Sequence, residues 1–141
     1  MIEVIFVIVI LGILAAIAIP KFAATRTDAQ LAKGRSDVST IRSAILTERQ
    51  SRLVTGDHSW ISELSDNATT LFKGKDDHIL LMYGIKSGTT SGHWRTTDSG
   101  EPYVHYKFKI GATDCAFSYD SSDGSFTLDD DQDSICNNLV E

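Results

Sequence analysis

An apolar run from Val4 to Ile19 opens the sequence and constrains the fold more than any other feature, because it contains no charged residue. A transmembrane helix needs about 20 such residues, and the flanking Met1, Ile2 and Phe22 bring the run close to that length. A secretory signal peptide has a basic residue before its apolar stretch and a small-residue cleavage site after it. The sequence shows neither feature around this run. We therefore expect a helix that enters a membrane.

Three residues do not suit a plain membrane anchor. Glu3 places a carboxylate at the start of the run, where burial is costly unless a positive charge neutralises it. Gly12 and Pro20 both weaken a helix, glycine by about 1 kcal/mol and proline by about 3 kcal/mol. Proline also lacks a backbone N–H to donate. The sequence therefore predicts a helix that is loosened or kinked between Gly12 and Pro20.

Beyond Pro20 the pattern becomes amphipathic. One face carries apolar residues at helical spacing, and these are Leu31, Val38, Ile41 and Ile45. Gly56 is suited to end such a helix, since glycine readily adopts the left-handed conformation found after a helix C-terminus. Together with the apolar run, this pattern predicts one helix about 75 Å long, with half of it outside any membrane.

The rest of the chain predicts an antiparallel sheet. A short helix is expected at SWISELS (59–65), and surface loop elsewhere in 56–77. Strand signals follow in HILLMYGI (78–85), around 93–96, in PYVHYKFKI (102–110), and in a hairpin of 115–119 and 125–128 turning at Asp123-Gly124. Alternation places Val104, Tyr106, Phe108 and Ile110 on one face. Four antiparallel strands packed on the second half of the helix would form an α+β domain.

The string IEVIFVIVILGILAAIAIPKF resembles the N-terminal signature of type IV pilins and of the pseudopilins of type II secretion systems. In that family a Glu stands before an unbroken apolar run, and a Pro follows seventeen residues after the Glu. Glu3 and Pro20 have this spacing. By the same spacing, the N-methylated first residue of the family would lie two positions before Met1. The resemblance is close in this segment and extends to the rest of the chain only in general layout.

The resemblance implies a chain in two parts. Residues 1–20 would be a half-helix that lies first in the membrane and then in the core of a filament. Residues 21–141 would be a globular head, with an amphipathic helix at 21–55, a loop at 56–77, and the sheet and C-terminal loop at 78–141. The Glu3 carboxylate would pair with the N-terminal amine of a neighbouring subunit, because a buried ion pair leaves neither charge uncompensated.

The function that the resemblance implies is structural: a subunit that polymerises into an extracellular, type IV pilus-like filament. Its expected partners are other copies in a helical homopolymer, an inner-membrane assembly platform, a prepilin peptidase, and membrane lipid before assembly. The expected location is the bacterial inner membrane and then the cell surface. One alternative is the major pseudopilin of a type II secretion or DNA-uptake system, with a periplasmic head. An alternative of another class is a monomeric, membrane-anchored binding module.

Two cysteines, Cys115 and Cys136, form no CxxC pair and no zinc-like cluster. In an exported chain they would form one disulfide, which would contribute about 3 kcal/mol in the loop-entropy model. In a cytosolic chain they would be two unrelated thiols. Because the resembled pilins carry a C-terminal disulfide around a surface loop, the resemblance implies the Cys115–Cys136 bond.

The C-terminal segment is acidic. Asp129, Asp131 and Asp133 alternate as oxygen ligands do at the start of a calcium loop. Ser134 and Val140 occupy the positions where that loop has its glycine and its closing glutamate. Related major pseudopilins bind calcium in their C-terminal loops, and the competing interpretation is a solvated acidic loop without metal. No other cofactor is expected.

Neither catalysis nor nucleic-acid binding is indicated. The four histidines are scattered singly, and the sequence has no GxSxG, HExxH or glycine-rich phosphate loop, so we expect no enzyme. The net charge is −6, and from Gly56 onward six Lys/Arg stand against fifteen Asp/Glu. Phosphate binding needs clustered basic residues, which argues against a nucleic-acid site in this half of the chain.

Overall fold

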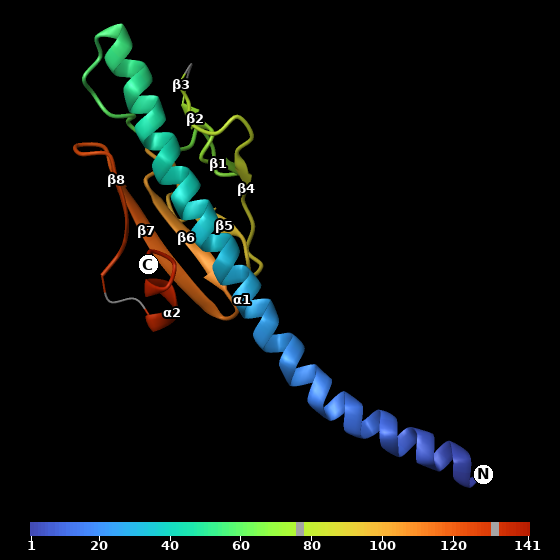
Figure 1. The fold of residues 1–141 in the computed structure, drawn as a ribbon. Helices are drawn as coiled ribbons and strands as arrows, with labels where there is room; N and C mark the ends of the chain where they lie inside the picture. Colours follow the sequence, from blue (N-terminus) through green and yellow to red (C-terminus); the bar gives the residue numbers. More distant parts are fainter. Residues whose placement is uncertain (76–77, 131–132) are drawn as a thin grey trace.

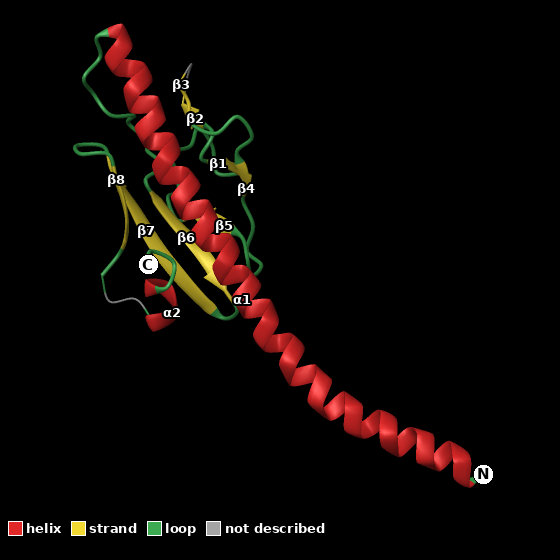
Figure 2. Cartoon of the chain, viewed as in Figure 1, coloured by secondary structure: helices red, strands yellow, loops and turns green. Residues whose placement is uncertain are grey.

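The computed structural model describes residues 1–75, 78–130 and 133–141, apart from the side chains of residues 20, 23 and 24 (Figure 1). A long helix, α1 (Ile2–Thr55), is followed by a head in which short and long strands precede a one-turn helix, α2 (Ser134–Asn137). The first half of α1 projects away from the head, and the second half lies across the sheet (Figure 2). The fold is therefore α+β, as the sequence predicts.

α1 spans 54 residues, or about 80 Å. It is helical through Gly12 and Pro20, so the helix is not broken there. Its axis curves between the projecting half and the half that packs on the sheet (Figure 1). It ends at Gly56, which has φ 87°, and the N–H of Gly56 donates to the Leu53 carbonyl at 3.2 Å. The predicted stop at Gly56 is confirmed.

The main sheet has the strand order β5-β6-β7-β8 and is antiparallel throughout. Its strands are β5 (Trp94–Thr96), β6 (His105–Ile110), β7 (Thr113–Asp120) and β8 (Ser125–Leu128). In the register, Phe108 faces Cys115 and Phe117 faces Leu128. These four strands lie where the sequence predicts them, and the predicted hairpin is formed by β7 and β8.

Two small antiparallel pairs lie beside the main sheet. β1 (Thr70–Leu71) pairs with β4 (Ile85–Lys86), and β2 (Gly74–Lys75) pairs with β3 (His78–Ile79). The predicted single strand over 78–85 is therefore wrong, because only its two ends are paired. β1 and β2 also lie inside the stretch that was expected to be loop.

The short helix expected over 59–65 is also wrong. Its Ser65 hydroxyl instead accepts a hydrogen bond from the Phe72 N–H at 2.9 Å and bonds the Tyr106 hydroxyl at 2.8 Å. Its Glu63 carboxylate accepts from the Tyr103 N–H at 3.0 Å. Distant donors also take backbone carbonyls that a local helix would have used: the Ile61 carbonyl accepts from the Tyr119 hydroxyl at 2.8 Å, and the Leu64 carbonyl accepts from the Gly74 N–H at 3.0 Å.

The core lies between α1 and the main sheet. Val38, Ile41 and Ile45 are buried and Leu31 is half-buried, which confirms the predicted apolar face of the helix. They meet a cluster of aromatic rings from the sheet and the β1 region, which are Phe72, Trp94, Tyr106, Phe108, Phe117 and Phe126. The head therefore has a hydrophobic core of its own, in which the first half of α1 takes no part.

Candidate functional site

The N-terminal half of α1 is the first candidate site. Ile2–Ile19 has a mean hydropathy of 3.1 and none of it is buried. By length and composition this segment is able to cross a membrane, although signal sequences near an N-terminus share these properties. Contiguous apolar surface of this extent marks a site of contact with lipid or protein. The chain therefore carries a surface that must be covered by something outside its own head.

Glu3 lies in the first turn of α1, where a negative charge suits the positive end of the helix dipole. Its side chain is exposed and has no hydrogen-bond partner among the described residues. The pairing of this carboxylate with a neighbouring amine stays a prediction, as does the loosening of α1 at Gly12 and Pro20 in another environment. A Cβ added at Gly12 would meet nothing within 4 Å.

A disulfide joins Cys115 of β7 to Cys136 of α2, with a Cα–Cα distance of 5.4 Å and both residues buried. It holds the C-terminal segment against the sheet. Arg35 of α1 donates from Nε to the Asn138 carbonyl, and Leu139 is buried next to α1. The C-terminal segment is thus fixed both by a covalent bond to the sheet and by contacts with the helix.

The acidic loop is only partly described. Asp129 lines a surface cavity, and Asp133 is exposed immediately before α2. Asp131 lies outside the described residues. Within the described part of the chain, no group of three or more His, Cys, Asp or Glu side chains is placed to hold a metal ion. Calcium binding at Asp129, Asp131 and Asp133 therefore stays a prediction.

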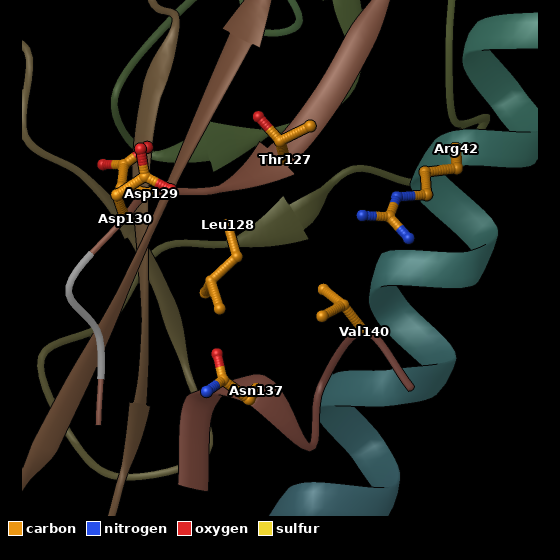
Figure 3. A pocket seen from close by; sticks show the side chains of 7 residues that line it. All are labelled: Arg42, Thr127, Leu128, Asp129, Asp130, Asn137 and Val140. Atoms are coloured by element: carbon orange, nitrogen blue, oxygen red, sulfur yellow. The ribbon is translucent and has the colours of Figure 1, made fainter. Parts of the chain in front are cut away.

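A groove runs along one side of α1, between the helix, β8 and the C-terminal residues; we call it the C-terminal groove. Its central cavity of about 410 Å³ is lined by Leu128, Val140, Asp129 and Arg42 (Figure 3). A neighbouring hollow of about 420 Å³ shares Arg42 and Val140 and is bordered by Leu46, which is 57% exposed. Arg42 donates from Nε to the Phe126 carbonyl at 3.0 Å.

An exposed apolar protrusion lies at the end of β3 and in the segment that joins β3 to β4; we call Ile79, Met82 and Tyr83 the apolar knob. Their exposed fractions are 64%, 77% and 87%. The sequence pattern predicted these residues inside a strand, whereas the structure leaves them on the surface. Neither the groove nor the knob was foreseen, and the only available signal was the apolar run HILLMYGI itself.

The buried charges of the head have partners within the head. Glu48 bonds Arg52 at 2.5 Å and lies 3.1 Å from His78, while its Oε2 atom has no partner among the described residues. Lys75 contacts both Glu101 and Glu63, and these hydrogen bonds raise the pKa of Lys75. These pairs join β3 to α1, and they join β2 to the segments that carry Glu63 and Glu101.

Comparisons with models of known families, with curated proteins and with solved structures found no significant match to this chain. The geometry alone therefore defines its class. An exposed apolar half-helix continues without a break into a head, where its second half packs on an antiparallel sheet closed by a C-terminal disulfide. This is a pilin-like architecture, and it suggests a pilus-type subunit.

Proposed function

We propose that this protein is the structural subunit of a type IV pilus-like filament. The membrane holds the subunit through the first half of α1 before assembly. In the filament, the same half-helices pack against one another in the core and the heads form the outer shell. Glu3 pairs with the N-terminal amine of a neighbouring copy during assembly.

One observation carries this proposal: an 18-residue apolar helix, wholly unburied, is the direct continuation of the helix that forms the core of the head. A separate anchor joined by a flexible linker would leave the head free to move. Here the helix is continuous, so the orientation of the head follows that of the apolar half. Such a rigid connection suits a repeating assembly, since each copy presents its head in the same way.

A pseudopilus subunit is the second candidate within this class. The alternating acids at Asp129, Asp131 and Asp133 favour it, because calcium held there would order the C-terminal loop. Calcium-dependent stability of the head without long surface filaments would support a pseudopilin. Long filaments whose stability does not depend on calcium would support a pilin.

The proposal is tested on cells that produce the protein. Material sheared from their surface is examined by negative-stain electron microscopy, and mass spectrometry identifies the subunit and its N-terminal residue. We expect thin filaments composed of this chain. Recovery of the protein only as a membrane-bound monomer, with no filaments and with unchanged behaviour after substitution of Glu3, would overturn the proposal in favour of an anchored binding module.

A further inference from the structure

We draw no further inference here: the strongest candidate, the hollow between α1 and β3 where the buried Glu48 carboxylate lies 3.1 Å from His78 and has one oxygen without a partner among the described residues, carries nothing because Arg52 already pairs with that carboxylate and because nothing in the described part of the chain, which omits residues 76–77 immediately before His78, shows what covers it.

Discussion

The indole N–H of Trp94 donates a hydrogen bond to the carboxylate of Asp37 at 3.0 Å, and this bond ties edge strand β5 to α1. Trp94 is fully buried among aromatic rings, so its N–H has no access to water. Lys33 forms a salt bridge with the same carboxylate at 2.8 Å. Asp37 of α1 thus provides the acceptor for the indole N–H, which is the only polar group of the Trp94 side chain.

Asp37→Ala should destabilise the head by about 1–3 kcal/mol, because it leaves a buried donor without an acceptor. Asp28→Ala removes an exposed acid from the same helix and is the matched control. Urea unfolding of the full chain in detergent, followed by tryptophan fluorescence, measures both. Equal stability of the two variants would contradict the role given to Asp37.

Gly34→Ala should destabilise the head although alanine is the better helix former. A Cβ at this position would lie 2.6 Å from Leu139 Cδ2 and 2.6 Å from Phe108 Cε1, so the core must move at a cost of about 1–3 kcal/mol. Gly12→Ala adds the same methyl group where nothing lies within 4 Å, and should stabilise the helix by about 1 kcal/mol. Thermal unfolding compares the two; a stabilising Gly34→Ala would refute the packing described for α1.

Removal of the disulfide by the double substitution Cys115→Ala and Cys136→Ala should lower the stability of the head by about 3 kcal/mol, since the unfolded chain gains loop freedom. A reducing agent should lower the melting temperature of the unaltered chain towards that of the double variant. The double variant itself should not respond to the reducing agent, which makes it the control. An unchanged melting temperature would show that the bond does not stabilise the C-terminal segment.

The Asp98 carboxylate should make stability depend on pH. Burial opposes its ionisation, but hydrogen bonds from His105 and from the Val104 N–H hold the pKa of Asp98 below its usual 3.8. A lowered pKa stabilises the fold above pH 3.8, and this contribution is lost as the pH falls through the lowered value. Asp98→Ala should therefore be less stable than the unaltered chain at pH 7, with a difference that shrinks below pH 3.8. A stability difference that stays constant across this pH range would contradict the lowered pKa of Asp98. Asp66→Ala, which removes an exposed carboxylate, is the control.

Glu3→Val should slow or prevent filament assembly, because the amine of the neighbouring copy would be left without its counter-ion. Glu3→Gln keeps the size and hydrogen-bonding capacity of the side chain but not its charge, and should fail in the same way. Both variants should still insert into the membrane, as tested by cell fractionation. Normal filaments from Glu3→Val in the electron microscope would exclude the proposed pairing.

Much of the fold could be predicted because periodicity is a local property. Ile41 and Ile45 repeat at helical spacing and are buried, and Tyr106, Phe108 and Ile110 alternate and lie on the core face of β6. Asp123-Gly124 marked the turn between β7 and β8 correctly. In each case the spacing of apolar residues within one segment shows which face is buried when another helix or strand packs against it.

Prediction failed where distant residues compete for the same backbone. The segment at 59–65 has a helix-like pattern, but Ser65 bonds Tyr106 of β6 and Glu63 accepts from the N–H of Tyr103, just before β6. The apolar run at 78–85 was expected to form one strand, yet only its two ends are paired, because the short β2–β3 and β1–β4 pairs divide it. These long-range hydrogen bonds and strand pairings cannot be read from the pattern of a single segment.

For the candidate site, the sequence alone determined the length and apolar character of the N-terminal half-helix, the seventeen-residue spacing of Glu3 and Pro20, and the two available cysteines. These depend on the composition and spacing of one segment. Only the tertiary structure decided that the C-terminal segment forms a groove with α1 and that Met82 and Tyr83 stay exposed. Such surfaces arise when distant segments pack together, so their shape depends on the whole core and not on any stretch of the chain.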